Sequence, residues 1–189
     1  GVSAIHEGAR LIHWATEQNE FNRSVAPGPL AAMFDPPYTT WHVGRVSGGT
    51  ADNITAKDCH FNMFYRAVPG DEPAKLDQMY SDKVSEVKSA MQGIRPESDI
   101  VLKRRFAVPP LKPEEAGESE SLVRAITGDN ASHVVSYGTE AGQFQAAGYS
   151  AVVCGPGDIA QAHQPNEFIE VAQFEEGHQF MRDLLEKLK

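Results

Sequence analysis

The stretch that decides the fold covers residues 38–70, YTTWHVGRVSGGTADNITAKDCHFNMFYRAVPG. Its first part, Tyr38–Val46, is rich in Thr, Trp and Val, which predicts a strand that ends at Gly48-Gly49. Its last part, Cys59–Val68, alternates in side-chain character and predicts a second strand, with Pro69-Gly70 marking the end. Two successive strands therefore lie at the centre of the first half of the chain.

Helical periodicity flanks these strands on both sides. In front of them, apolar residues at spacings of three and four form one stripe of a helix: Val2, Ile5, Ala9 and Ile12. Behind them, Glu72–Met91 is predicted to form a long helix, and Ile100–Val108 a third strand with Lys and Arg in its middle. The order α-β-β-α-β over residues 1–107 is a split βαβ pattern that lacks its first strand.

The first residues are unusual for the start of a chain. They contain neither an initiator Met nor a signal peptide, and the first apolar stripe begins without a Ser, Asp or Asn cap in front of it. We therefore expect Gly1 to be an internal residue of a larger protein.

The character of the sequence changes after residue 108. Residues 109–120, rich in Pro and Glu, predict a linker or domain boundary. Beyond them, helices and strands alternate as in an α/β domain. The predicted helices are Ser121–Thr127, Glu140–Ala147 and Phe174–Leu188, and the predicted strands are His133–Tyr137 and Tyr149–Cys154.

Charge and composition exclude several classes of function. With 17 Lys and Arg against 26 Asp and Glu, the formal net charge is −9, which argues against sequence-independent binding of nucleic acid. No apolar run approaches the ~20 residues that cross a bilayer. Cys59 and Cys154 are far apart and predict neither a disulfide framework nor a Cys-based zinc site. The composition indicates an acidic, soluble, cytoplasmic protein.

Two loops of the second half carry candidate site residues. His163 lies in CGPGDIAQAHQPNE (residues 154–167), after a predicted buried strand, where an imidazole can bind a metal with Glu167 as an outer partner. Taken alone, a loop histidine is more often a surface residue. In GTEAGQF (residues 138–144), free N–H groups and the Thr139 hydroxyl can hold a carboxylate or an oxyanion. The local alternative is that Thr139 caps the helix that follows.

In the first half, two polar residues stand near the ends of the predicted strands. Asn53 lies in the loop between the two strands, and Arg66 lies at the end of the second. Arginine is suited to bidentate binding of a carboxylate. An arginine at a strand end is also commonly a solvated charge, so local reasoning leaves both interpretations open.

Five phrases occur in an order that resembles a known family. They are GVSAI (1–5), GGTADN (48–53), FYRAVPG (64–70), YGTEAGQF (137–144), and CGPGD with AHQPNE (154–158 and 162–167). The series is similar to the acetylornithine deacetylases, within the dizinc aminoacylase family that includes succinyl-diaminopimelate desuccinylases and glutamate carboxypeptidases. The resemblance covers essentially all 189 residues.

The resemblance implies a specific architecture. Residues 1–107 would form a ferredoxin-like dimerisation lid without its first strand, through which two copies form a homodimer. Residues 108–189 would form the C-terminal half of a zinc-peptidase-like α/β catalytic domain. The fold class is therefore expected to be α/β, with an α+β lid followed by an α/β half-domain.

The resemblance also implies an activity: hydrolysis of N2-acetyl-L-ornithine to ornithine and acetate, in arginine biosynthesis. In the family, two Zn²⁺ ions, which Co²⁺ can replace, activate water and polarise the carbonyl. His163 matches a metal ligand. The residues matched to substrate binding are Asn53, Arg66, Gly138 and Thr139.

The general base and the other metal ligands of the family lie upstream of the matched region, so no catalytic residue is assigned. A catalytic zinc needs about three protein ligands. This chain alone is therefore expected to bind no catalytic metal and to be inactive. The alternatives are a non-catalytic dimerisation or binding module, or a related desuccinylase or carboxypeptidase.

Overall fold

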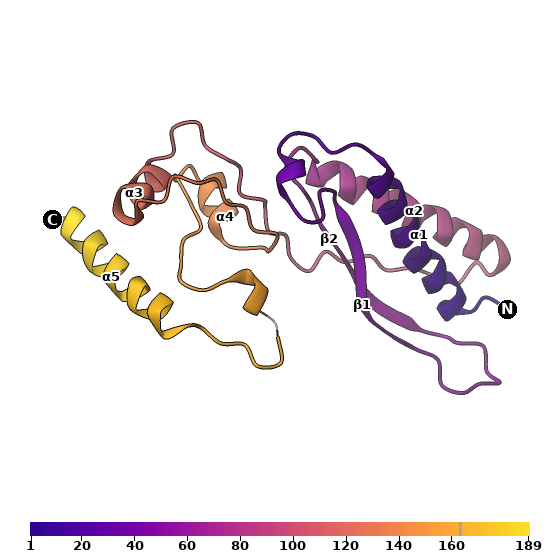
Figure 1. Cartoon of the computed structure of the whole chain (residues 1–189). Coiled ribbons are helices and arrows are strands. Elements are labelled where there is room, and N and C mark those ends of the chain that lie inside the picture. The colour runs from indigo at the N-terminus through magenta and orange to yellow at the C-terminus, as the bar shows by residue number, and fades with distance from the viewer. Residues whose placement is uncertain (163) are drawn as a thin grey trace. The chain divides into compact units, whose positions relative to one another are not determined.

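A pair of antiparallel strands organises the first of two units in a computed structural model of the chain, which describes residues 1–162 and 164–189 (Figure 1). The two units are Gly1–Ala107 and Val108–Lys189. Strand β1 spans Thr40–Gly48 and strand β2 spans Cys59–Arg66, so both strands predicted over residues 38–70 are present, with bounds shifted by two residues at most.

The two long helices of the first unit cover one face of this sheet. Helix α1 spans Ala4–Ser24 and helix α2 spans Pro73–Ile94, and the two run side by side next to the strands (Figure 1). Along β2, half-buried and exposed side chains alternate, so only one face is covered. The buried residues form two clusters, Leu11, Val84, Val87 and Met91 in the first, and Trp14, Ala15, Trp41 and Leu76 in the second.

Aromatic rings fill the second cluster. Trp41 of β1 lies with its ring centroid 4.9 Å from that of Trp14 and 5.0 Å from that of Tyr65, while Tyr80 of α2 stacks on Trp14 at 5.7 Å. Burial raises the pKa of Tyr80 to about 12. Because these rings come from both helices and both strands, this cluster joins every element of the sheet layer to the helix layer.

Two asparagines of α1 bind the backbone of β1. Asn19 Nδ2 donates to the Trp41 carbonyl oxygen at 2.8 Å, and the Trp41 N–H donates to Asn19 Oδ1 at 2.7 Å. Asn22 Nδ2 donates to the carbonyl oxygen of Thr39 at 2.7 Å. The side-chain amides of the two asparagines therefore provide hydrogen-bond partners for backbone groups of Trp41 and Thr39 that face α1.

The third predicted strand of this unit, Ile100–Val108, is not a strand in the structure. Residues 100–110 have no regular secondary structure, although Ile100 packs on the first buried cluster. The segment is held by side chains: Arg104 forms an ion pair with Asp77, and Arg105 Nη1 donates to Asn62 Oδ1 at 3.2 Å. A strand needs a neighbouring backbone, and β2 pairs with β1 alone among the described residues. The sequence-based assignment was wrong for this reason.

The start of α1 also differs from the expectation. Gly1–Ser3 precede the helix, and Ser3 occupies the N-cap position with an extended backbone, without a side-chain capping bond. The helix is tied at this end by the N–H of Ala4, which donates to the Ala56 carbonyl oxygen at 2.9 Å.

Helices dominate the second unit. Helix α3 spans Glu118–Thr127, α4 spans Ala141–Ala146 and α5 spans Val171–Lys187, and α3 contacts α5. A short 3₁₀ helix, η2, spans Ile159–Gln161, and its counterpart in the first unit, η1, spans Ala31–Met33.

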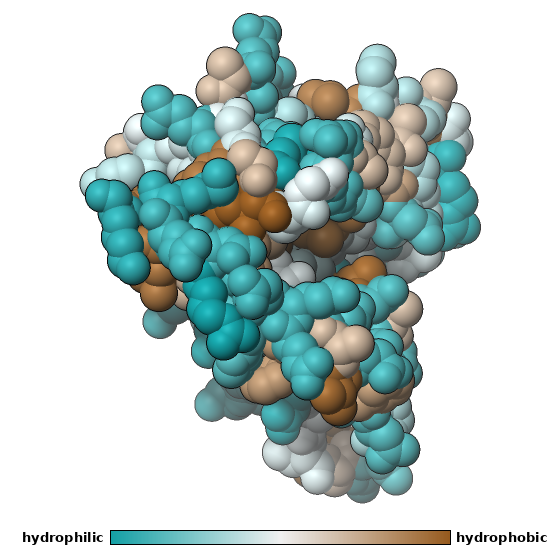
Figure 2. Space-filling view, turned by 60° about the vertical axis from the view of Figure 1, so that its left-hand side comes forward, coloured by the Kyte–Doolittle hydropathy of each residue, from teal (hydrophilic) through white to brown (hydrophobic). Residues whose placement is uncertain are grey.

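The two strands predicted in the second unit are absent from its described residues. His133–Tyr137 and Tyr149–Cys154 have no strand pairing. Their apolar side chains lack the neighbouring strands that would cover them, and Tyr149 is 65% exposed. On the face of the chain shown in Figure 2, hydrophobic residues lie among hydrophilic ones. None of the helices that the structure describes is long and apolar enough to span a membrane.

Candidate functional site

The predicted site residues are divided between the two units. Asn53 and Arg66 belong to the first unit, and Gly138 and Thr139 belong to the second. His163, the predicted metal ligand, lies outside the described residues.

Asn53 is exposed in a turn of the β1–β2 loop. The loop is fixed at both ends. At its start, a Cβ on Gly48 would lie 2.6 Å from the Asp58 carbonyl oxygen, and Gly49 has a positive φ of 75°, so both positions favour glycine. At its end, Ala56 is buried. Asn53 is therefore exposed to solvent in a loop whose two ends are held in place by packing.

Arg66 is the last residue of β2 and lies on the exposed face of the sheet, opposite Thr40 in the register. His60, Asn62 and Phe64 share this face because side chains two residues apart point the same way. The face opposite the helices therefore carries polar side chains together with the ring of Phe64, and it holds the guanidinium group at one end. This arrangement suits recognition of an anionic group that approaches the sheet from its open side.

Thr139 immediately precedes the N-cap of α4. The N-cap residue is Glu140, and Thr139 Oγ1 accepts a hydrogen bond from the N–H of Ala141 at 3.2 Å. The interpretation of Thr139 as a residue that stabilises the helix start agrees with this contact. The neighbouring Gly138 is exposed, and a Cβ there would meet only Val108 Cγ1, at an ordinary 3.8 Å. Its backbone is therefore accessible.

Gly142, in the same motif, has a structural role that the sequence did not reveal. It is buried in α4, and a Cβ at this position would lie 2.0 Å from the Pro109 carbonyl oxygen. The helix and the Pro109-Pro110 segment can pack this closely only because residue 142 has no side chain. This contact sets the position of α4 and hence of the Gly138–Thr139 loop.

Glu114, in the stretch 109–120 that was predicted to be a linker or domain boundary, also helps to hold α4 in place. Its carboxylate accepts hydrogen bonds from Ser150 Oγ at 2.6 Å, from Gln145 Nε2 at 2.9 Å and from the N–H of Ala151 at 3.2 Å. The Ser150 and Gln145 bonds are the main reasons why the pKa of Glu114 is lowered from its ordinary value of 4.5. The segment is therefore an integral part of the second unit.

We expect the second unit to lose stability as the pH falls below about 4.5, because protonation of Glu114 removes bonds that only its ionised form accepts fully. Because the pKa of Glu114 is lower in the folded state than in the unfolded state, its ionised form stabilises the folded state. This stabilisation is complete at a pH above the unfolded-state pKa, and it is lost as the pH falls through the folded-state pKa. Thermal unfolding between pH 3 and pH 7 measures it. Between pH 7 and pH 3, the melting temperature of Glu114→Gln should fall by less than that of the unaltered chain. The melting temperature of Glu115→Gln should fall by as much as that of the unaltered chain. Equal acid losses in all three proteins would contradict the role of Glu114.

Asp158 and Gly157 shape the chain just before the predicted metal ligand. Asp158 is the N-cap of η2, and its Oδ1 accepts from the N–H of Ala160 at 2.8 Å. Gly157 has a φ of 109°, which supports the interpretation of Gly155-Pro-Gly157 as a tight turn.

The residues that the structure describes do not form a complete metal site. Among them, no group of three or more His, Cys, Asp or Glu side chains is placed to hold a metal ion. A catalytic zinc needs about three protein ligands.

Comparisons with known proteins bear on both units. Residues 1–92 match the family model of the peptidase dimerisation domain. The chain is 32% identical over 173 residues to an acetylornithine deacetylase of Myxococcus xanthus, an alignment that covers 90% of this chain and 43% of that protein. It is 32% identical over 175 residues to an acetylornithine deacetylase of Erwinia tasmaniensis, covering 91% of this chain and 43% of that protein. The chain thus spans less than half the length of these relatives.

Proposed function

Because residues 1–92 match the model of the peptidase dimerisation domain, we propose that this chain is part of a metal-dependent amidohydrolase. The reaction proposed for the whole enzyme is hydrolysis of N2-acetyl-L-ornithine to ornithine and acetate, in arginine biosynthesis in the cytoplasm. The observation that carries this proposal is the similarity to acetylornithine deacetylases along about nine-tenths of the chain. Two Zn²⁺ ions, replaceable by Co²⁺, would polarise the amide and activate water in the whole enzyme.

In this proposal, residues 1–107 form the lid and mediate homodimerisation. Two features of the first unit support a lid that lacks its first strand. The edge of β2 away from β1 has no strand partner among the described residues. Arg105 binds Asn62 of β2 through its side chain, without backbone pairing to β2. An additional strand would satisfy the open edge.

Residues 108–189 form part of the catalytic domain in this proposal. Supporting it, the described residues of this unit contain helices and extended segments but no paired strand, and they leave many apolar side chains exposed. Helices with exposed apolar faces are typical of a layer that covers a sheet. The sheet itself would be supplied by the part of the relatives that lies outside the alignment with this chain.

The proposed substrate contacts follow from the chemistry of the four candidates. Arg66 is suited to bidentate binding of the amino-acid carboxylate, and Asn53 can add an amide donor. The accessible backbone at Gly138 and the Thr139 hydroxyl would contact the substrate carbonyl or the oxygen that becomes negative in the transition state. His163 would be a metal ligand, completed by residues from the rest of the enzyme.

We expect the purified 189-residue chain to show no hydrolysis of N2-acetylornithine, even with added Zn²⁺ or Co²⁺. The reason is that one histidine cannot hold a catalytic zinc by itself. Release of ornithine, measured against a blank of buffer and metal, tests this expectation. The Myxococcus xanthus relative serves as the positive control, and turnover above the blank by the chain alone would refute the expectation.

A chimera distinguishes the proposed enzyme fragment from a non-catalytic dimerisation module. The part of the Myxococcus xanthus protein that precedes the aligned region would be joined to this chain. A competent catalytic half should give a chimera that hydrolyses N2-acetylornithine, and Arg66→Ala in that chimera should lower kcat/KM by roughly 10²-fold, as expected for a lost charge-assisted contact. A folded but inactive chimera would favour the dimerisation module, and a preference for N-succinyl substrates would favour a desuccinylase.

A further inference from the structure

Thr39 is a buried polar residue that lies immediately before β1. It is only 1% exposed, whereas threonine is mostly found at protein surfaces. A buried hydroxyl is tolerated only when its donor and acceptor positions have partners, because it has lost its contacts with water. The partners of Thr39 therefore show what this hydroxyl holds together.

The Thr39 hydroxyl is bonded to two residues of the segment that follows β2. Thr39 Oγ1 donates to Asp71 Oδ2 at 2.5 Å, and it accepts a hydrogen bond from the N–H of Val68 at 3.1 Å. The N–H of Asp71 donates in turn to the Val68 carbonyl oxygen at 3.2 Å. The hydroxyl thus uses its one donor and one of its two acceptor positions, so it is paired in both roles.

These bonds hold the end of β2. The backbone pairing of the sheet stops at Thr40 and Arg66, which lie opposite each other in the register. The last residues of a paired element commonly open first, because they are held on one side only. Here the bond between Thr39 and Val68 adds one more contact beyond Arg66. Arg66 therefore has a bonded residue on either side of it along the chain.

Thr39 is itself held by helix α1. Asn22 Nδ2 donates to the Thr39 carbonyl oxygen at 2.7 Å. Through its carbonyl group and its hydroxyl, Thr39 links a long packed helix to the turn that follows Arg66. Asp71, at the other end of the hydroxyl bond, is exposed, so its carboxylate reaches the buried hydroxyl from the surface of the unit.

We propose that Thr39 and Asp71 are positioning residues for Arg66. This inference rests on the proposed function, in which Arg66 binds the substrate carboxylate. Bidentate binding requires the guanidinium plane to match the carboxylate plane, so the strand end that carries the arginine has to be held in one orientation. Thr39 and Asp71 act in this way through the backbone of residues 66–68, and neither has to contact the substrate.

Backbone order in the complete chain tests whether the two residues fix the strand end. In the unaltered chain, the N–H order parameters of residues 66–68 should be about 0.85, which is typical of a rigid backbone. Thr39→Val removes the hydroxyl but keeps the shape of the side chain, and it should lower these order parameters toward about 0.6. Thr39→Ser keeps the hydroxyl and should leave them close to those of the unaltered chain.

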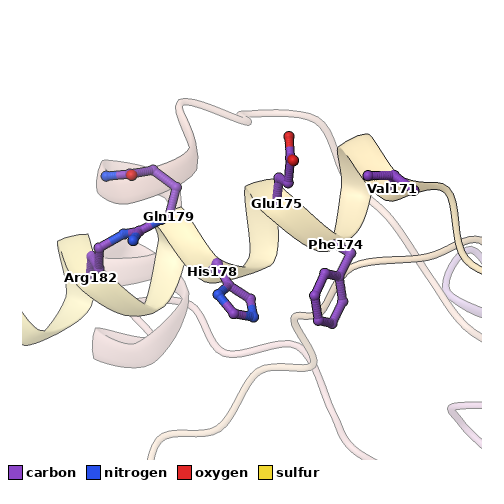
Figure 3. Close-up of a pocket in the computed structure, with 6 residues that line it drawn as sticks. All are labelled: Val171, Phe174, Glu175, His178, Gln179 and Arg182. Atoms are coloured by element: carbon purple, nitrogen blue, oxygen red, sulfur yellow. The ribbon is translucent and has the colours of Figure 1, made fainter.

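Asp71→Ala tests the same bond from its exposed end, in case Thr39→Val does not fold. It should loosen the same backbone residues without removing any side chain from the core. Asp82→Ala is the matched control, because Asp82 is exposed on α2 and accepts a hydrogen bond from Gln78 of the same helix. Arg182 lines an open pocket along α5 in the second unit (Figure 3), and its backbone order parameter should stay the same in every variant.

A double-mutant cycle tests whether Thr39 acts through Arg66. It uses the chimera of this chain with the upstream part of the Myxococcus xanthus protein. In this chimera, Thr39→Val should raise KM for N2-acetylornithine roughly tenfold and change kcat by less than about twofold, because the carboxylate is bound alike in the ground state and the transition state. When Arg66 is already replaced by Ala, the same substitution should change KM by less than about twofold. A merely structural role of Thr39 would lower activity by similar factors in both backgrounds.

The results distinguish a failure of this inference from a failure of the proposed function. If a folded Asp71→Ala chain keeps the order of residues 66–68, or if Thr39→Val leaves KM unchanged while Arg66→Ala raises it, the two residues do not position Arg66 and the inference is wrong. An inactive chimera, or an Arg66→Ala chimera with unchanged kcat/KM, would contradict the proposed function instead. The order parameters of residues 66–68 would then still decide whether Thr39 and Asp71 hold Arg66 in place.

Discussion

Replacing Trp41 by Ala is expected to destabilise the first unit by about 3–5 kcal/mol, which is the usual cost of truncating a buried aromatic side chain. Trp41 is only 4% exposed and contacts the rings of Trp14, Tyr65 and Tyr80. Since a domain is typically stable by about 5–15 kcal/mol, this loss would unfold a substantial part of the population under mild denaturing conditions.

The cost at Trp41 comes from packing and not from hydrogen bonding. Its indole Nε1 is buried without a hydrogen-bond partner among the described residues, so truncation removes no such bond. Trp41→Phe should therefore cost much less than Trp41→Ala. Phe21→Ala is the control for an exposed aromatic residue, at 63% exposure, and should change stability by less than about 0.5 kcal/mol. Urea unfolding monitored by far-ultraviolet circular dichroism measures all three, and an equal loss in Trp41→Ala and Phe21→Ala would contradict the prediction.

Replacing Gly142 by Ala is expected to destabilise the second unit by about 1–3 kcal/mol or more, the range seen when an interior is overpacked. The added Cβ would lie 2.0 Å from the Pro109 carbonyl oxygen and 3.0 Å from the Pro110 carbonyl carbon. Both are backbone atoms, which cannot move aside by changing a rotamer. Helix α4 would have to shift, and with it Gln145, whose Nε2 donates to the Lys112 carbonyl oxygen at 2.8 Å.

The direction of the stability change in Gly142→Ala distinguishes the close contact from the intrinsic helix preference of alanine. In an open helix, replacing Gly by Ala is favourable by roughly 0.5–1 kcal/mol, so a destabilisation can only come from the close contact. Gly155→Ala is the matched control in the same unit, because a Cβ there meets nothing within 4 Å. Hydrogen exchange of the α4 amides should accelerate in Gly142→Ala and stay unchanged in Gly155→Ala. If hydrogen exchange of the α4 amides is unchanged in Gly142→Ala, the backbone at Pro109 can move away from the new Cβ without destabilising α4, and the prediction is wrong.

The alternation along residues 59–66 and the helical periodicity on either side were sufficient to predict the central elements of the first unit. β2 begins at Cys59 as predicted, and α2, Pro73–Ile94, extends the predicted helix by three residues at its end. These patterns are local, because each residue's face is set by its neighbours along the chain. The similarity to acetylornithine deacetylases, inferred from five short phrases, is likewise confirmed by the relatives found.

The sequence did not reveal the glycine and carboxylate contacts that position the candidate site. Gly142 appears in the sequence as one glycine of a short motif, yet its closest neighbour is Pro109, 33 positions earlier. Glu114 appears as one of several glutamates in a Pro-rich stretch, yet it joins Gln145, Ser150 and Ala151. No periodicity marks such residues, because their importance depends on which distant backbone approaches them.

The sequence by itself determined the helices, the two paired strands and the similarity to acetylornithine deacetylases, since each depends on local patterns or on short motifs. Only the tertiary structure decided which apolar segments become strands. Ile100–Val108 and Tyr149–Cys154 have the composition of strands, but backbone pairing is a contact between segments, and neither segment pairs with another backbone among the described residues. A strand is stabilised by its partner, so its existence cannot be read from its own residues alone.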